Sequence, residues 1–250
     1  IDLVIAGLAA VAAGAVNALA GGGTLISFPV LIALGVSPLA ANITNAIALC
    51  PGYFGATLAQ LRNLEGQRRR ALVLVPVSAL GGLIGALILV HTGERTFTKL
   101  VPWMLLVASL LLALQDPVRA MVLQRAGADP DGQRTRLLTI VTVFLASIYG
   151  GFFSAGMSVL IVAVLGLTSA DSFTRLNALK QGLAFTVNVA AVLFFLWSDY
   201  VVWSATIVMA IGALAGGALG GRLASKLKPN VLRWIVVAVG ITIAIVYWVR

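Results

Sequence analysis

Long apolar segments, separated by short polar ones, constrain this chain more than any other feature. A helix that crosses a lipid bilayer needs about 20 predominantly apolar residues. Eight candidates of that kind lie at residues 2–20, 39–61, 71–92, 98–115, 137–153, 171–197, 201–221 and 230–249. Charged residues make up only 10% of the chain, against about 25% in soluble domains. The sequence therefore predicts an all-α, polytopic membrane protein.

Two further apolar pieces, Thr24–Leu34 and Met157–Leu167, are too short to cross a membrane alone. Each would be about 16 Å long as a helix, against a hydrocarbon core of about 30 Å. Helix-breaking residues enclose both pieces: Gly21-Gly22-Gly23, Gly35 and Pro38 around the first, and Gly150, Gly151, Gly156 and Gly166 around the second. We therefore expect two short broken or re-entrant helices in addition to the eight long ones.

The two short pieces occupy corresponding places because the chain repeats itself. When the chain is aligned with itself so that Asn45 falls on Asn177, Ala46 falls on Ala178. A register that differs by one position aligns Val77 with Val208, Ala79 with Ala210, Gly81 with Gly212, Leu83 with Leu214, Gly85 with Gly216 and Trp103 with Trp234. The sequence predicts two homologous halves, residues 1–115 and 138–250, joined by a cytoplasmic linker over residues 116–137.

The basic residues favour an inverted relation between these halves. Lys and Arg are retained on the cytoplasmic side of a membrane, and this chain has 17 of them against 8 Asp and Glu. If the short pieces do not cross, nine basic residues fall inside and six outside. If each completes a discontinuous crossing, twelve fall inside and three outside, namely Arg95, Lys99 and Arg250. The second arrangement predicts inverted repeats, as in many transporters.

The joints that precede the two short pieces are candidate ligand sites. Gly22, Gly23 and Thr24 precede the first, and Ser154, Gly156 and Ser158 form a weaker version at the second. Glycine lets a ligand approach the backbone, and the free N–H groups of a helix N-terminus suit an anion. Close packing of membrane helices through small residues is the alternative interpretation.

Buried amides are the second group of candidates. Asn45 and Asn177 lie near the joints, and Gln181 follows Asn177 by one helical turn. A buried amide requires a partner, which is either a substrate oxygen or a group on another helix. Both interpretations stay open for Asn45 and Asn177, whereas a structural role is favoured for Asn17 and Asn188.

Lys180 is the most informative single residue. It lies nine residues after Asp171, or about 13 Å along a helix. A lysine near the middle of a membrane span costs about 2.5–3.5 kcal/mol, so such residues usually face a cavity and have a function. Snorkelling to the nearer interface is the alternative. We favour a role for Lys180 in binding an anion.

Catalytic and metal-binding patterns are missing. His91 is the only histidine and Cys50 the only cysteine, which removes the usual ligand sets for zinc and any plausible nucleophilic triad. The basic residues lie between apolar segments, so the net charge of +9 does not indicate a nucleic-acid partner. We expect neither an enzyme nor a cofactor or metal.

Several motifs resemble those of the TauE/SafE family of membrane transporters, also called the sulfite exporter family. The resemblance covers essentially the whole chain. It rests on Ala20-Gly21-Gly22-Gly23, on Pro29 with Leu31 and Gly35, on the Asn- and Ala-rich start of the next helix, and on Gly150-Gly151-Phe152-Phe153. The second copy departs from the family pattern at Met157 and at Ala163, where a glycine cluster and a proline are common.

The resemblance implies a multi-pass protein of the bacterial inner membrane that moves sulfite, sulfoacetate or another organosulfonate. The residues themselves support a narrower prediction, a secondary transporter with discontinuous helices, alternating access and a small anionic substrate. A non-transporting scaffold or assembly subunit and a passive anion channel are the alternatives. The expected partners are the small anion and the lipid bilayer, and the sequence leaves a homodimer open.

Overall fold

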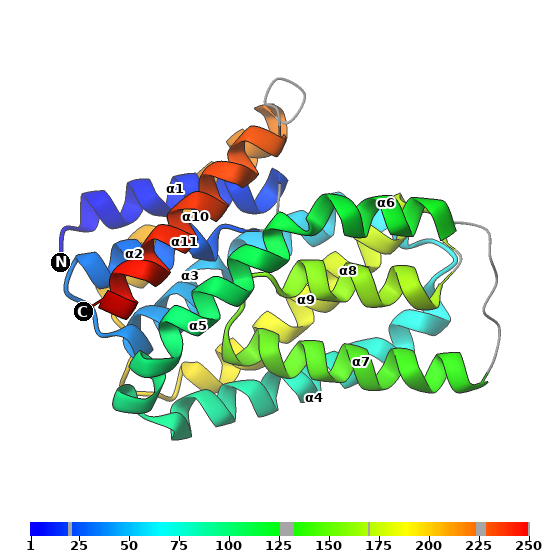
Figure 1. The fold of residues 1–250 in the computed structure, drawn as a ribbon, viewed down its shortest axis with the longest axis horizontal. Helices are drawn as coiled ribbons and strands as arrows, with labels where there is room; N and C mark the ends of the chain where they lie inside the picture. Colours follow the sequence, from blue (N-terminus) through cyan, green and yellow to red (C-terminus); the bar gives the residue numbers. More distant parts are fainter. Residues whose placement is uncertain (20–21, 126–132, 170, 224–228, 250) are drawn as a thin grey trace.

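The computed structural model describes residues 1–19, 22–125, 133–169, 171–223 and 229–249, and every regular element in those ranges is helical (Figure 1). The elements in chain order are α1 (Leu3–Leu19), α2 (Thr24–Ala33), α3 (Pro38–Ala59), the 3₁₀ helix η1 (Leu61–Leu64), α4 (Arg68–Thr92), α5 (Glu94–Ala113), α6 (Gln115–Arg125), α7 (Gln133–Phe152), α8 (Met157–Thr168), α9 (Phe173–Phe195), α10 (Trp203–Leu223) and α11 (Pro229–Val249). The predicted all-α class is confirmed.

The eight long segments of the sequence are helical, but their lengths and hydropathies differ. Among the described residues, α4, α5, α7 and α9 are long and apolar enough to cross a membrane, and α1, α10 and α11 contribute shorter apolar stretches. Large apolar side chains on their outer faces are exposed, including Leu8, Leu80, Leu145 and Ile211. A membrane provides the apolar surroundings that such faces require, so the chain is a multi-pass membrane protein.

The segment after α5 contains a helix that the sequence did not predict. In residues 116–137, the predicted linker, α6 occupies Gln115–Arg125 and α7 begins at Gln133. Asp116 and Pro117 resemble turn residues, but both are also favourable in the first turn of a helix, where proline leaves no N–H unpaired and an acid faces the positive dipole end. The buried Val122 then packs α6 against Gly166 of α8.

The two short pieces are short helices, as predicted, with ten residues in α2 and twelve in α8. Figure 1 shows that α1 and α7 each run to the middle of the molecule, from opposite ends, and that α2 and α8 run back to the end from which their partners came. Each pair is therefore a helical hairpin that reaches only part of the way across the molecule.

The two ends of the molecule carry different charges. We call one the Arg-rich end, defined by Arg62, Arg68, Arg69, Arg70 and Arg175. There Asp171 pairs with Arg70 at 3.2 Å and with Arg175 at 3.3 Å. At the opposite end, Ser37 donates to Glu94 over 2.8 Å and thereby links the start of α3 to the start of α5.

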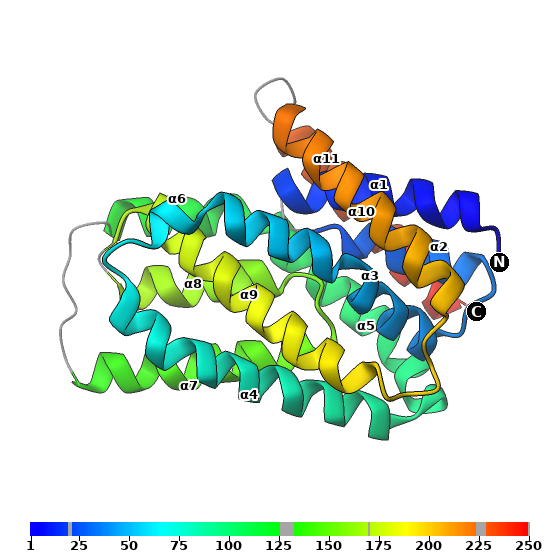
Figure 2. The same ribbon diagram turned by 180° about the vertical axis from the view of Figure 1, so that it is seen from behind.

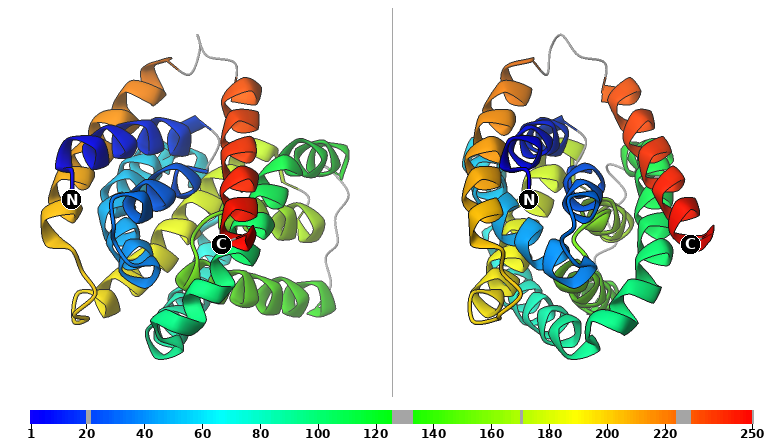
Figure 3. Two further views of the ribbon diagram at one scale, coloured as in Figure 1. Left: turned by 60° about the vertical axis from the view of Figure 1, so that its left-hand side comes forward. Right: turned by 90° about the vertical axis from the view of Figure 1, so that its left-hand side faces the viewer.

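Helix pairs rather than layers organise the packing. The α1–α10 and α4–α7 pairs are in extensive contact, and so are α5–α11, α3–α9, α3–α10 and α4–α9. Seen from the end, the α1–α2 hairpin lies between α10 and α11 (Figure 3). This arrangement encloses α2, while α8 packs against α6, α7 and α9.

Candidate functional site

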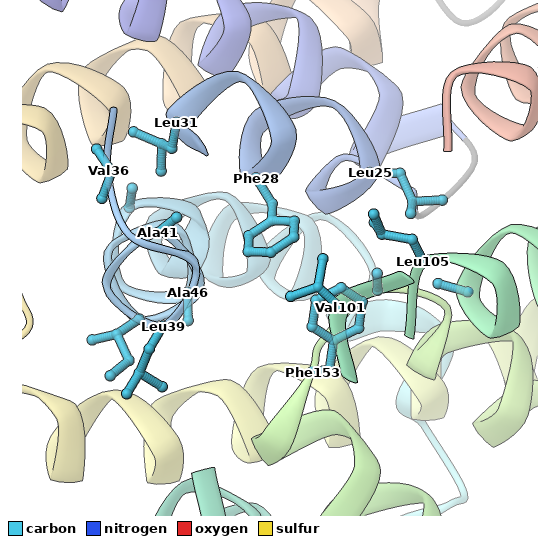
Figure 4. Packing of buried hydrophobic residues seen from close by; sticks show 14 of the residues in the cluster. Leu25, Phe28, Leu31, Val36, Leu39, Ala41, Ala46, Val101, Leu105 and Phe153 are labelled. Carbon is cyan, nitrogen blue, oxygen red and sulfur yellow. The ribbon is translucent and has the colours of Figure 1, made fainter. Parts of the chain in front are cut away.

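The N-termini of the two short helices meet in the middle of the molecule. We call the residues between α1 and α2 the first break, of which Gly22 and Gly23 are described, and residues 153–156 the second break. Thr24 Oγ1 lies 3.1 Å from Ser154 Oγ, although the two residues are 130 positions apart. Beside this contact the rings of Phe28 and Phe153 pack edge to face with centroids 5.5 Å apart (Figure 4).

Both short helices begin without a side-chain cap. Neither Gly23 before α2 nor Gly156 before α8 is a residue whose side chain could accept from the first-turn amides. Gly156 has a φ of +80°, a conformation that glycine adopts without strain. Most first-turn amides are paired with carbonyl oxygens of the breaks, since Leu25 donates to Gly22, Ile26 to Gly23 and Val159 to Gly156. The positive dipole ends of the two helices are nevertheless directed toward one region, which favours an anion.

Asn45 supplies a further donor beside this region. Its side chain is fully buried. The Ser27 hydroxyl lies 2.5 Å from Asn45 Oδ1 and 3.2 Å from the carbonyl oxygen of Gly23, so Asn45 is joined to the first break through Ser27. Within the described part of the chain, Asn45 Nδ2 has no hydrogen-bond partner. A buried donor without a partner is costly, and an anion would satisfy it.

Other polar side chains hold the two breaks in place. Asn17 Oδ1 accepts from the amide of Gly23 at 3.3 Å. Asn42 donates to the carbonyl oxygen of Phe152 at 2.9 Å, and the Tyr149 hydroxyl donates to the carbonyl oxygen of Ala155 at 2.7 Å. These bonds satisfy backbone groups that the broken helices would otherwise leave unpaired in an apolar region.

A cavity of about 510 Å³ extends from the first break toward the Arg-rich end, and we call it the access cavity. It is lined by Gly14 and Asn17 of α1; Leu49, Pro51, Gly52, Gly55, Ala56 and Ala59 of α3, followed by Gln60; Gln181 of α9; and Ala213, Leu214, Gly217 and Ala218 of α10. Leu49 lies one turn after Asn45, and Asn17 contacts Gly23. The cavity thus leads from the polar cluster at the breaks to the end of α3.

The described contacts divide the predicted site residues into two groups. Gly23, Thr24, Asn45 and Ser154 meet at the breaks. Gln181 lines the access cavity instead, and Asn177 is bonded to a residue that lines it. Asn177 donates to Gln60 Oε1 at 2.9 Å, and the Gln181 carbonyl oxygen accepts from Thr57 at 3.3 Å, while Gln60 and Gln181 both line the cavity.

Lys180 lies on the interior face of α9. Leu176 and Ala184, one turn to either side, are fully buried, so the Cβ of Lys180 points into the bundle and not toward lipid. The side chain is half-buried and makes neither a hydrogen bond nor an ion pair with the residues that the structure describes. Val187, which lies beside Gly150 of α7, is two turns further on, or about 10 Å from Lys180 along the axis.

Packing accounts for the glycines of the first break. A Cβ on Gly23 would lie 2.3 Å from the carbonyl oxygen of Ala13, and one on Gly22 would lie 2.7 Å from the side chain of Leu112. Gly23 is therefore required for the close approach of α1 and α2, whereas a Cβ on Gly22 would require only a shift of the Leu112 side chain. Ser158 is buried in the first turn of α8.

Sequence reasoning missed Ser27, Gln60 and Gly55. Ser27 follows Gly23 by one helical turn, a spacing that could have placed it at the first break. Gln60 and Gly55 gain their place only from the packing of α3 against α9 and α10, which no local pattern shows.

Among the described residues there is no cluster of three or more His, Cys, Asp or Glu that could hold a metal ion.

Comparison with known proteins agrees with this architecture. The family model described as sulfite exporter TauE/SafE matches residues 6–247. A probable membrane transporter protein of Sinorhizobium, ORF9, is 28% identical over 240 residues, which cover 95% of this chain and 89% of the relative. The probable membrane transporter protein YfcA of Escherichia coli K12 is 24% identical, with 92% and 83% covered. A probable membrane transporter protein of Haemophilus influenzae is 27% identical, with 89% and 85% covered. No solved structure matches the chain.

Proposed function

Since the chain belongs to the TauE/SafE sulfite exporter family of membrane transporters, we propose that it is a secondary transporter for a small anion. The family description names sulfite export, which supports a sulfur-containing substrate, and we extend the proposal to sulfoacetate and other organosulfonates. The relatives are named as membrane transporters and not as enzymes, in keeping with a chain in which no catalytic pattern is visible.

The contact between Thr24 and Ser154 is the observation that carries this proposal. It brings the N-termini of two broken helices together at mid-depth, beside Asn45 Nδ2, which has no hydrogen-bond partner among the described residues. An anion that leaves water must recover its solvation from N–H and O–H donors and from positive dipole ends. Broken helices whose N-termini face an anionic group are a recurrent device of secondary transporters.

An inverted repeat forms the second part of the proposal. The α1–α2 hairpin starts at the end opposite to the Arg-rich end, whereas the α7–α8 hairpin starts at the Arg-rich end. The pairing is exchanged in the same way, since α1 packs on α10 while α7 packs on α4. The Arg-rich end would be cytoplasmic under the positive-inside rule, and the access cavity would then open to the cytoplasm.

Binding and flux measurements test the function directly. Thermal shifts of the purified protein with sulfite, thiosulfate, sulfoacetate and simple carboxylates identify the anion, and uptake of the anion that stabilises most into proteoliposomes measures transport. We expect saturable uptake that Asn45→Ala weakens. Steady conductance without saturation would support a passive channel instead. Absence of both binding and flux for every anion would support a scaffold.

A further inference from the structure

The close contacts between α1 and α10 recur between α7 and α4. In each case a Cβ added to a glycine would meet a backbone oxygen of the partner helix within 3 Å. Gly212 and Gly216 of α10 meet the carbonyl oxygens of Gly7 and Val11 of α1, and the corresponding Gly81 and Gly85 of α4 meet those of Phe144 and Ile148 of α7. In the reverse direction, Gly14 of α1 meets that of Ala213, and Gly151 of α7 meets that of Gly82. The same two alignments relate all three pairs of contacts. One places Gly14 of α1 on Gly151 of α7, and the other, which places Trp103 on Trp234, aligns α4 with α10. The two pairs are therefore equivalent units, residue by residue.

The packing of α10 on α3 can be compared with that of α4 on α9 in the same way. Near the opposite end, the Val202 amide donates to Thr44 Oγ1 at 3.0 Å. Eleven residues further along both helices, or about 16 Å, lie Ala213 and Gly55. The alignment that places Trp103 on Trp234 makes Gly82 of α4 the counterpart of Ala213. The alignment that places Asn45 on Asn177 makes Val187 of α9 the counterpart of Gly55.

These two equivalent places differ. A Cβ on Gly82 would lie 2.7 Å from the carbonyl oxygen of Val187 and 3.0 Å from its Cα, so α4 and α9 are in tight contact there. A Cβ on Gly55 would meet no atom of the described residues within 4 Å, and Gly55 and Ala213 both line the access cavity. Figure 2 shows α10 and α3 adjacent where α10 begins and diverging along their length.

Gly55 has no packing role in this arrangement. A glycine in a helix interior is about 1 kcal/mol less favourable than alanine, and open space surrounds this one. Its absent Cβ is explained if α10 closes onto α3 in a second arrangement, in which Gly55 meets Ala213 as Gly82 now meets Val187. Each of the two contacts then contains one glycine, on α4 in the first and on α3 in the second.

We propose that the protein has a second access cavity for its anion at the opposite end, between α4, α7 and α9, which is closed in this structure by the contact of Gly82 with Val187. This proposal rests on the transport function proposed above. Equivalence assigns Ser154 and Asn188 to its wall, because they correspond to Asn17 and Ala56 of the access cavity. Asn188 is 3% exposed, and its Oδ1 has no partner among the described residues, so opening would hydrate it.

The two cavities are alternatives. When α4 separates from α9 at Gly82, α10 closes onto α3 at Gly55, so the anion at the breaks is reached from one end at a time. The α1–α10 and α4–α7 pairs keep their glycine contacts and move as units. Ser154 and Thr24 stay at the meeting point of both cavities.

Cysteine accessibility tests this proposal without knowledge of the substrate. In a Cys50→Ala background, which has no other cysteine, Ala56→Cys reports on the access cavity and Asn188→Cys on the second one. An impermeant, negatively charged methanethiosulfonate is applied to right-side-out and to inverted vesicles. We expect Ala56→Cys to react from the Arg-rich end and Asn188→Cys from the opposite end.

Two glycine variants should shift the equilibrium between the two arrangements, one with each cavity open, in opposite directions. Gly82→Ala prevents the α4–α9 contact, and it should raise the reaction rate of Asn188→Cys about tenfold while lowering that of Ala56→Cys. Gly55→Val fits the present structure but blocks closure of α10, and it should lower the rate of Asn188→Cys about tenfold. Ser147→Cys, fully buried on α7, should stay unreactive in each background and so reports unfolding.

The proposal is overturned if Asn188→Cys does not react from the opposite end while Ala56→Cys reacts from the Arg-rich end. It is also overturned if Gly55→Val leaves the rate of Asn188→Cys unchanged, a comparison that holds even if Gly82→Ala fails to fold. Failure of the transport function has a different signature. In that case both cysteines react as expected, but no anion crosses the membrane.

Discussion

Replacing Lys180 by methionine separates a binding role from a structural one. Lys180→Met keeps an unbranched side chain of similar length and removes the charge. A hydrogen bond to a charged group contributes about 1.5–3 kcal/mol, which at 1.4 kcal/mol per tenfold change corresponds to an increase in the Kd of the anion of about 10- to 150-fold. We expect an increase in this range, measured by thermal shift against anion concentration and by uptake into proteoliposomes.

Lys180→Met should weaken anion binding without weakening the fold. Lys180 has no ion pair with the described residues and points into the bundle, so its replacement leaves no orphaned partner. The free energy of unfolding should stay constant or rise, by at most about 3 kcal/mol on insertion scales. Lys180→Arg should retain part of the binding, because the charge survives. Lys99→Met, the same change at an exposed position of the opposite end, serves as the matched control. Unchanged Kd and uptake in Lys180→Met would refute the assignment and support snorkelling.

Three further changes test the polar contacts. Asn45→Ala should weaken anion binding about tenfold while lowering stability by less than about 1.5 kcal/mol in thermal unfolding, because Ser27 keeps its bond to Gly23. Thr24→Val and Ser154→Ala should show a coupling energy of about 0.6–1.7 kcal/mol in a double-mutant cycle, and additive effects would mean that their contact contributes nothing. Asp116→Ala should lower the free energy of unfolding by about 3 kcal/mol, which is more than the loss expected for Arg233→Met. The reason is that the Arg233 side chain is 5% exposed and would lose its carboxylate partner, whereas the Asp116 side chain is 47% exposed. Equal losses of stability in thermal unfolding would contradict this order.

The long helices and the two short ones could be predicted because local rules decide them. Length and hydropathy set the long segments, and glycine and proline end the short ones. The structure begins α2 at Thr24 and α8 at Met157, where the sequence placed them. The α6 helix escaped prediction because Asp116 and Pro117 suit a turn and a first helical turn equally well. In the structure, packing of Val122 on α8 favours the helix.

The candidate site could be predicted only in part. The predicted repeat indicated Thr24 and Ser154, and the polarity of Asn45 indicated a buried amide. The structure adds the contact between Thr24 and Ser154, which lie far apart in the chain, and an Asn45 Nδ2 that has no partner among the described residues. Gln60 was missed because its position depends on how the end of α3 meets α9. Such a position is a property of the tertiary structure and leaves no local pattern in the sequence.

Some glycines within the helices prevent a clash with a neighbouring helix and others do not, and no single-sequence pattern distinguishes these two kinds. Gly14 and Gly151 each prevent a clash in the structure as it stands, and they fasten α1 to α10 and α7 to α4. Gly55 prevents none, yet it occupies the position where α10 would meet α3 if the access cavity closed. A substitution at Gly14 or Gly151 should therefore lower stability, whereas Gly55→Val should leave stability intact and stop transport. A glycine whose removal affects only turnover belongs to the moving contact, and this difference separates the two kinds by experiment.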